Sequence, residues 1–198
     1  MKQAFIIHGY NGSNEGNWFP WLKKELEKLE FHVDCPQFPN AAEPQEQEWT
    51  QTISDLWKPE IAQENYQKNP TDPSFRAIIG HSLGGTELLR ALERNWAQPI
   101  DLAVIVGATL NDSRRPALEN FFATPFNWEK IQRNCKKFIL IFSDNDPHIK
   151  VETGAYIQDH LGPNAELFML HNAGHMMKSD GFEEFPLLLE LLKKNAQD

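Results

Sequence analysis

The chain has 198 residues, of which 40% are hydrophobic and 24% are charged, and its formal net charge is −9. This length suits one domain with a sizeable core, so we expect a single domain over residues 1–198. The composition excludes global disorder, and the acidic charge disfavours nucleic acids and anionic membrane surfaces as partners. We therefore expect a small-molecule partner, with a monomer as the default oligomeric state.

The amino-terminal segment and the cysteines indicate the cellular compartment. The first apolar run, Ala4–Ile7, is too short for a signal peptide, and no run approaches the length of a membrane-spanning helix. Cys35 and Cys135 lie far apart without Cys-x-x-Cys spacing, which favours two reduced structural thiols. Together these features predict a cytoplasmic protein.

Short apolar runs alternate with amphipathic segments along the chain. In chain order, the first half predicts a strand at Gln3–His8, a helix at Trp18–Leu29, a strand at Phe31–Cys35, a helix at Glu46–Gln67 interrupted near Pro59, and a turn at residues 69–73. The second half predicts strands at Ala77–Gly80, Leu102–Gly107, Lys137–Ser143 and Ala165–Leu170, helices at Leu83–Trp96, Glu152–Leu161 and Phe182–Lys194, and an irregular segment with room for a short helix at Asn111–Asn127.

The four central strands are continuous apolar runs rather than alternating ones. Continuous runs indicate burial on both faces, which predicts an α/β fold: a mostly parallel sheet of about six strands with helices on both faces. Such sheets place their functional groups at the carboxyl ends of the strands. The segments HGYNG, GHSLGG, VGATL, SDNDP and HNAGH each follow a predicted strand, so we expect the site there.

A Gly-x-Ser-x-Gly pattern occupies residues 80–84, directly after an apolar strand and directly before a helix. This context is typical of a nucleophile elbow, in which a strained turn lifts the hydroxyl of Ser82 above the sheet. Side chains at Gly80 and Gly84 would clash in so tight a turn. The alternative interpretation is an ordinary structural turn.

A serine nucleophile needs a base and an orienting acid, which follow the elbow in the order acid, then histidine. Asp144 and Asp146 compete for the acid. We favour Asp146, because it lies further into its loop and Pro147 stiffens the turn; Asp144 would then be a loop acid or turn cap. His171 and His175 compete for the base, and we favour His175, which lies in a loop free to reach over the sheet edge.

An oxyanion hole and a substrate pocket complete the expected site. The backbone N–H of Leu83, at the helix start, is one expected donor, and that of Tyr10 is the other, with Asn11 as the alternative. Trp18 and Phe122 could wall a small apolar acyl pocket. The alternative is that these aromatic side chains belong to the core.

Metal and cofactor sites are not expected. No His-Glu-x-x-His or clustered ligand spacing is present, so the sequence predicts no metal. The HGYNGSNEGNW segment superficially resembles a nucleotide-binding loop, but the spacing of Gly9, Gly12 and Gly16 does not give Gly-x-Gly-x-x-Gly. We therefore expect no cofactor.

Five segments, taken together, resemble the small serine hydrolase family of retinoblastoma-binding protein 9 and the bacterial YdeN-like proteins. They are HGYNGSNEGNWFPWL, IIGHSLGG, ATPFNWEKI, FSDNDPHI and NAGHM. The resemblance implies a compact α/β-hydrolase fold without a large lid, and a catalytic triad of Ser82, Asp146 and His175. A protein-binding member of the family is associated with a Leu-x-Cys-x-Glu segment, which neither Cys35 nor Cys135 carries here.

The hypothesis from the residues and the resemblance is a serine hydrolase with a Ser-Asp-His triad. It would cleave a small carboxylic ester, thioester or amide through an acyl-enzyme on Ser82. The alternative hypothesis is a non-catalytic protein- or ligand-binding member of the same fold, because a fold does not determine a function.

Overall fold

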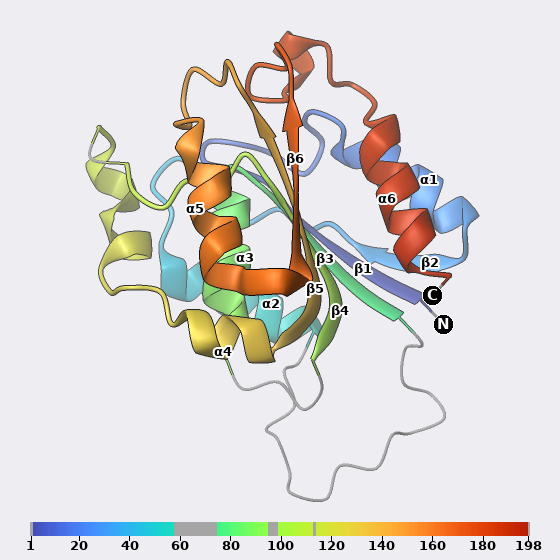
Figure 1. Cartoon of the computed structure of the whole chain (residues 1–198), viewed down its shortest axis with the longest axis horizontal. Coiled ribbons are helices and arrows are strands. Elements are labelled where there is room, and N and C mark those ends of the chain that lie inside the picture. Colours follow the sequence, from blue (N-terminus) through green and yellow to red (C-terminus); the bar gives the residue numbers. More distant parts are fainter. Residues whose placement is uncertain (1, 58–74, 95–98, 113, 198) are drawn as a thin grey trace, which may run out of the picture.

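The computed structural model describes residues 2–57, 75–94, 99–112 and 114–197 of the chain. A single six-stranded sheet runs through the centre of the molecule (Figure 1). Its strands are β1 (Lys2–Ile7), β2 (Phe31–Asp34), β3 (Phe75–His81), β4 (Ile100–Val106), β5 (Cys135–Ser143) and β6 (Ala165–Leu170). All six predicted strands are therefore confirmed, because their ends differ from the prediction by no more than two residues.

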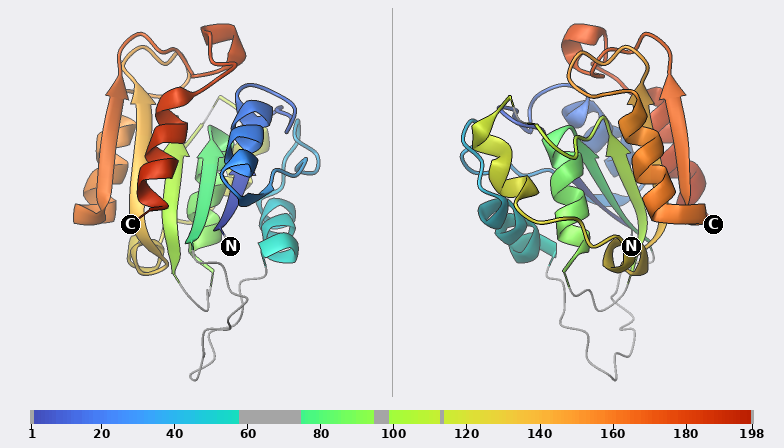
Figure 2. Two further views of the ribbon diagram at one scale, coloured as in Figure 1. Left: turned by 90° about the vertical axis from the view of Figure 1, so that its right-hand side faces the viewer. Right: turned by 60° about the vertical axis from the view of Figure 1, so that its left-hand side comes forward.

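The strand order is β2-β1-β3-β4-β5-β6, and every neighbouring pair is parallel. The chain passes from β1 to β2 on one side and then returns to β3 on the other, so the direction of winding reverses between β1 and β3. At such a point the loops that follow the two strands diverge and leave a crevice at the carboxyl ends of the strands. The loops after β1, β5 and β6 gather at this edge of the sheet (Figure 2).

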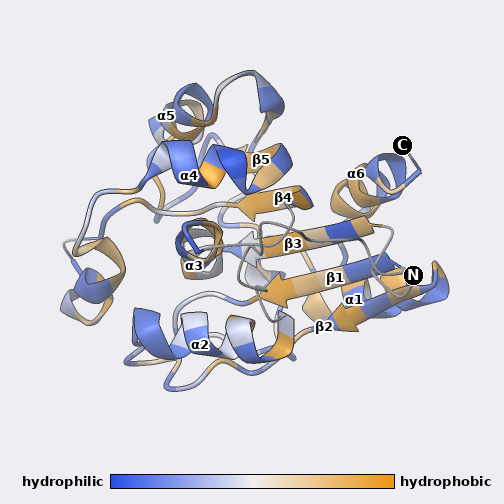
Figure 3. Cartoon of the chain, turned by 90° about the horizontal axis from the view of Figure 1, so that it is seen from below, coloured by the Kyte–Doolittle hydropathy of each residue, from blue (hydrophilic) through white to orange (hydrophobic). Residues whose placement is uncertain are grey.

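Helices cover both faces of the sheet, as the sequence predicted. Helices α1 and α6 lie on one face, and α2, α3, α4 and α5 lie on the other (Figure 3). The bounds are α1 (Phe19–Lys28), α2 (Glu46–Trp57), α3 (Leu83–Leu92), α4 (Trp128–Arg133), α5 (Glu152–Leu161) and α6 (Pro186–Asn195), with 3₁₀ helices η1 (Pro116–Phe122), η2 (Gly162–Asn164) and η3 (Lys178–Asp180). None of the helices in the described ranges has the length and apolarity to cross a lipid bilayer.

The two helical layers enclose two hydrophobic cores, one on each face of the sheet. On one face Val104 of β4 packs with Leu22 of α1 and Leu188 of α6. On the other face the next residue, Ile105, packs with Leu88 of α3. Both β4 side chains are fully buried, which explains why this strand is apolar at every position from Leu102 to Val106. Burying each such side chain contributes about 1.5–3 kcal/mol.

Three helices differ from the sequence-based prediction. The sequence did not predict α4, a six-residue helix in which the Asn127 side chain accepts the Lys130 N–H at 3.0 Å as an N-cap. The closing helix begins at Pro186 instead of Phe182, because proline suits the first turn of a helix. Helix α3 ends at Leu92, before the predicted end.

Some predicted features lie outside the described residues. They are the continuation of the second helix beyond Trp57, its interruption near Pro59 and the turn at residues 69–73.

Candidate active site

Ser82 lies at the turn between β3 and α3, with backbone angles φ 57° and ψ −122°. A positive φ is costly for a residue that has a Cβ, so it marks a position that the surrounding structure holds in place. The Ser82 N–H donates to the Val106 carbonyl of β4 at 2.8 Å, which ties the turn to the middle of the sheet. Ser82 in turn lines a cavity at the carboxyl edge of the sheet.

Glycines let the backbone segments around Ser82 approach closely. A Cβ on Gly80 would lie 2.3 Å from the Gly84 carbonyl oxygen, and one on Gly84 would lie 2.3 Å from the Ile7 carbonyl oxygen. A Cβ on Gly9 would lie 2.9 Å from the Cβ of Ser82. The clashes predicted at Gly80 and Gly84 are therefore confirmed, and they involve backbone atoms that cannot move aside cheaply.

Asp146 and His175 come from the loops after β5 and β6 and meet at the same edge of the sheet. His175 Nδ1 and Asp146 Oδ2 lie 2.6 Å apart, and the two side chains are 5% and 2% exposed. The second carboxylate oxygen of Asp146 accepts the backbone N–H groups of His148 and Ile149, at 2.8 and 3.0 Å. A carboxylate oxygen can only accept a hydrogen bond, so Nδ1 of His175 must be the donor. In the neutral imidazole the hydrogen therefore lies on Nδ1, and Nε2 is left as an acceptor.

The charge state of Asp146 follows from these bonds. Burial raises the pKa of the Asp146 carboxyl, but the hydrogen bonds from His175 and from the two backbone amides outweigh it and hold the pKa below its ordinary value. The carboxylate is therefore ionised at neutral pH, with both oxygens engaged.

The loop that carries His175 is held from several sides. His81 Nε2 lies 2.8 Å from the backbone carbonyl oxygen of His175, and the Trp18 indole N–H donates to the Met176 carbonyl at 3.1 Å. The Asp180 carboxylate accepts the His175 backbone N–H at 3.0 Å. The position of the imidazole is therefore set by main-chain contacts as well as by Asp146.

Two further buried histidines act as neutral supports. Burial and the nearby His175 lower the pKa of His81 to about 3, so its ring is neutral. Because a carbonyl oxygen can only accept, the hydrogen lies on Nε2, which donates to the carbonyl. His8 Nε2 accepts the Phe38 backbone N–H at 3.0 Å, so His8 Nδ1 carries the hydrogen and donates to the Gly9 carbonyl at 2.9 Å. Burial lowers the pKa of His8 as well, which keeps this arrangement neutral.

Two residues that line the same cavity as Ser82 have backbone amides without an acceptor in the described parts of the chain. These residues are Tyr10 and Leu83. The Asn11 N–H donates to the Ala41 carbonyl at 2.6 Å. Of the two loop amides considered from the sequence, the Tyr10 amide is therefore the one left available for a ligand.

A second aspartate–histidine pair lies nearby but outside the cavity. His171 Nδ1 and Asp144 Oδ2 lie 2.5 Å apart, and the His171 side chain is 82% exposed. Neither residue lines the cavity that Ser82 faces. Burial and position, rather than the hydrogen bond itself, separate this pair from Asp146 and His175.

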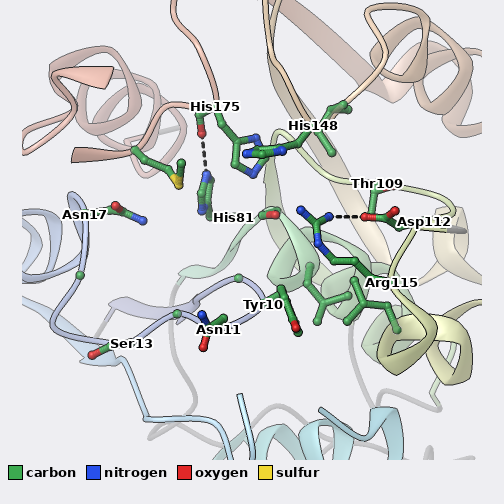
Figure 4. A pocket seen from close by; sticks show the side chains of 18 residues that line it. Tyr10, Asn11, Ser13, Asn17, His81, Thr109, Asp112, Arg115, His148 and His175 are labelled. Carbon is green, nitrogen blue, oxygen red and sulfur yellow. Dashed lines mark hydrogen bonds and ion pairs between the residues drawn. The ribbon is translucent and has the colours of Figure 1, made fainter. Parts of the chain in front are cut away.

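The cavity has a volume of about 360 Å³ and is lined by the loops that follow β1, β3, β4, β5 and β6 (Figure 4). Ser82, Leu83, Tyr10 and His175 all contribute to its wall. A hydroxyl, an imidazole and free backbone amides therefore surround a space that suits a small ligand.

One known protein family has a model that matches nearly the whole chain. The family model described as "Serine hydrolase" matches residues 4–194. The chain belongs to the serine hydrolase family. The resemblance noted from the sequence is thereby confirmed, and membership of this family supports a hydrolase function.

Relatives in the family match over nearly their whole length. Serine hydrolase RBBP9 of Rattus norvegicus is 27% identical over 194 residues, which cover 96% of this chain and 94% of that protein. YdeN of Bacillus subtilis is 27% identical over 193 residues with the same coverage, and its crystal structure superposes with a TM-score of 0.84 over the whole of both chains. Est1E of Butyrivibrio proteoclasticus shares the fold, with a TM-score of 0.71 at 13% identity over 98% of this chain and 87% of that one.

Two residues expected at the serine hydrolase site lie elsewhere. Trp18 is fully buried, stacks edge-on against Phe19 and Phe185, and does not line the cavity. Phe122 packs against the core on the α3 face and does not line it either. The prediction that they wall the cavity beside Ser82 is therefore wrong, because helical spacing directs Trp18 into the core. Trp18 instead supports the loop of His175 through its indole N–H.

The structure adds polar residues to the wall that the sequence did not single out. Thr109, Asp112 and Arg115 reach the cavity from the segment that follows β4 (Figure 4). The only sequence signal for them was their place after a buried parallel strand. Across the described ranges, no group of three or more histidine, cysteine or carboxylate side chains is placed to hold a metal ion.

Proposed function

We propose that this serine hydrolase cleaves a small carboxylic ester, thioester or amide through an acyl-enzyme on Ser82. The observation that carries the proposal is the buried hydrogen bond between Asp146 and His175, because His175 lines the same cavity as Ser82. Nucleophilic acyl transfer requires a hydroxyl and an imidazole in one site, with the imidazole held by an ionised carboxylate.

In the first step Ser82 Oγ attacks the carbonyl carbon of the substrate. Nε2 of His175, which is left as an acceptor by the bond at Nδ1, takes the proton of the hydroxyl. The ionised Asp146 holds the ring in this tautomer and stabilises the positive charge that develops on it. The product of this step is a tetrahedral adduct with a negative oxygen.

The negative oxygen of the adduct needs donors that are already in place. The N–H groups of Tyr10 and Leu83 are the donors we assign, because both residues line the cavity with Ser82 and neither N–H has an acceptor among the described residues. The helix-terminal position of Leu83 adds the positive end of the α3 dipole. Each such donor typically stabilises the transition state by about 3–4 kcal/mol.

The remaining steps return the enzyme to its starting state. The imidazolium gives its proton to the leaving alcohol, thiol or amine as the adduct collapses to an ester on Ser82. Water then attacks this ester while His175 takes a proton from it, and the second adduct collapses to a carboxylic acid and free serine.

Hydrolysis of 4-nitrophenyl butyrate tests the proposal. Ser82→Ala and His175→Ala are expected to lose activity by about 10³-fold or more, because the nucleophile or its base is removed. His171→Ala is the matched control, since it removes the same side chain from the exposed aspartate–histidine pair, and it is expected to keep the wild-type rate. Equal activity of Ser82→Ala and the wild-type protein would support the non-catalytic alternative.

A further inference from the structure

Arg115 places a cationic group in the wall of the cavity that Ser82 lines. Its side chain is 33% exposed and extends from the segment between β4 and η1. Figure 4 shows its guanidinium reaching from the side of Asp112 toward the middle of the cavity. Nothing in the hydrolytic steps above uses this group, although it lines the same cavity as Ser82 and His175.

Asp112 is the natural candidate to neutralise Arg115, but its carboxylate is already shared. The side chain of Asp112 is 4% exposed; its Oδ1 accepts Nε of Arg114 at 3.1 Å, and its Oδ2 accepts Nη1 of Arg115. Burial raises the pKa of Asp112, but the bonds from the two arginines outweigh it and hold the pKa below its ordinary value. One ionised carboxylate therefore faces two guanidinium groups.

The geometry leaves Arg115 donors directed at the cavity. A guanidinium has five N–H groups, and the Asp112 carboxylate engages one nitrogen of Arg115. The ring of Tyr10 lies 5.6 Å from the guanidinium carbon and helps to orient the group. Among the described residues of the cavity wall, Asp112 is the only acid, and both of its oxygens are occupied. A ligand that enters therefore meets arginine N–H groups rather than a free carboxylate.

We propose that Arg115 binds a carboxylate on the substrate, so that the enzyme prefers esters, thioesters or amides that carry a carboxylate besides the scissile group. This inference rests on the proposed function, whose site it completes. A planar guanidinium matches the two oxygens of a carboxylate in a way that an ammonium group does not. The protein as a whole has a net charge of −9 and therefore repels an anionic substrate. The attraction for a carboxylate comes from Arg115 in the cavity wall.

Two matched substrate pairs test the proposal. In the first pair the carboxylate is on the acyl side: the mono-4-nitrophenyl ester of adipic acid is compared with 4-nitrophenyl 6-methylheptanoate, its neutral isostere. In the second it is on the leaving group: 3-carboxy-4-nitrophenyl butyrate is compared with 4-nitrophenyl butyrate. The quantity measured is the ratio of kcat/KM for the charged and neutral members, after subtraction of the enzyme-free rate.

In at least one pair the wild-type ratio is expected to exceed that of Arg115→Gln by about tenfold or more, because hydrogen bonds to a charged partner contribute this much. Arg115→Lys keeps the positive charge but loses the planar group that can bind both carboxylate oxygens. Its kcat/KM ratio is expected to lie between the ratios of the wild-type protein and Arg115→Gln. Arg114→Gln is the matched control: it removes the same charge from Asp112, but its side chain is 59% exposed and does not line the cavity. Its ratio is expected to stay within about twofold of the wild-type ratio.

The outcomes separate this inference from the proposed function. Hydrolysis of the neutral esters that depends on Ser82, with no effect of Arg115→Gln on either ratio, would overturn the inference and leave the proposed function standing. Absence of any hydrolysis that depends on Ser82 would overturn the proposed function. In that case, calorimetric titration with monomethyl adipate decides the inference: binding about tenfold weaker in Arg115→Gln supports it, and equal binding overturns it.

Discussion

His81 and His175 are joined by a hydrogen bond from the imidazole Nε2 of His81 to the backbone carbonyl of His175, at 2.8 Å. His81 directly precedes Ser82, and its ring also lies against that of His175, with centroids 4.9 Å apart. The bond therefore connects the turn that presents the hydroxyl with the loop that presents the imidazole. Because the pKa of His81 is lowered to about 3, this donor stays neutral at the pH at which most enzymes work.

Replacing His81 tests whether this bond positions His175. His81→Phe is expected to lower the free energy of unfolding by about 1–3 kcal/mol, because a buried carbonyl loses its donor. It is also expected to lower kcat for 4-nitrophenyl butyrate more than it changes KM, because the imidazole is no longer held in place. His32→Phe is the control, at a histidine whose side chain is 60% exposed. An unchanged kcat in a folded His81→Phe protein would contradict the positioning role.

The two aspartate–histidine pairs offer a direct comparison of buried and exposed partners. Asp146→Asn is expected to lower kcat/KM by about 10³–10⁴-fold, because an amide no longer favours the tautomer with its hydrogen on Nδ1 or stabilises the imidazolium. Asp144→Asn makes the same change in the exposed pair and is expected to leave kcat/KM within about twofold of the wild-type value. A larger loss in Asp144→Asn than in Asp146→Asn would reverse the assignment of the acid.

Gly84, like Gly80, is predicted to tolerate substitution poorly. Gly84→Ala would bring a methyl carbon to 2.3 Å from the Ile7 carbonyl oxygen and 2.5 Å from that of His8. We expect a loss of about 3 kcal/mol in the free energy of unfolding, because the backbone must move to admit the methyl group. Gly16→Ala, whose nearest contact would be 3.2 Å away, is the control and is expected to cost less than about 1 kcal/mol. Similar stability of the two variants, measured by urea denaturation, would contradict this explanation of the elbow.

The buried carboxyl group of Glu87 is expected to make the stability of the fold depend on pH. Glu87 is fully buried in α3, its Oε1 accepts the hydroxyl of Thr50 at 2.7 Å, and its Oε2 has no partner among the described residues. Burial is the main cause that raises the pKa of Glu87 well above its ordinary value, so the folded protein holds this proton more tightly than the unfolded chain. The contribution of Glu87 to the free energy of unfolding is therefore at its full value below the pKa of about 4.3 that a glutamate has in the unfolded chain. It decreases as the pH rises above that value, through the raised pKa of the folded state.

Glu87→Gln removes this titration while keeping a similar shape. At pH 8 the variant is expected to be more stable than the wild-type protein by at least about 1 kcal/mol, and at pH 4 the difference is expected to shrink. Urea denaturation at the two pH values measures it. A difference that is the same at both pH values would show that Glu87 does not titrate as its burial implies.

The sequence was a good guide to the sheet and to the order of the site residues, for identifiable reasons. A strand such as β4 is buried on both faces from Leu102 to Val106 and is apolar throughout that run, so it could be found without knowledge of its neighbours in the sheet. The Gly80 and Gly84 pattern follows from clashes within a few residues of Ser82, and such local constraints are visible in sequence. The pairing of Asp146 with His175 could be anticipated because both follow strands that end at the same edge.

Features that depend on distant packing could not be predicted in the same way. The six-residue α4 is too short for hydrophobic periodicity, and only the capping residue Asn127 signalled it. Arg115 lines the cavity because of its tertiary position after β4, and nothing in the neighbouring sequence indicated that position. Trp18 could have faced the ligand or the core from its position before α1, and the packing of Phe185 against it shows that it faces the core.

Covalent labelling with a fluorophosphonate tests the central claim most directly, because the reagent reacts with an activated serine hydroxyl. Intact-protein mass and peptide mapping are expected to give one adduct on Ser82 of the folded wild-type protein, and its formation is expected to be strongly slowed in His175→Ala. An adduct on a different residue, or no adduct on folded protein, would contradict the account.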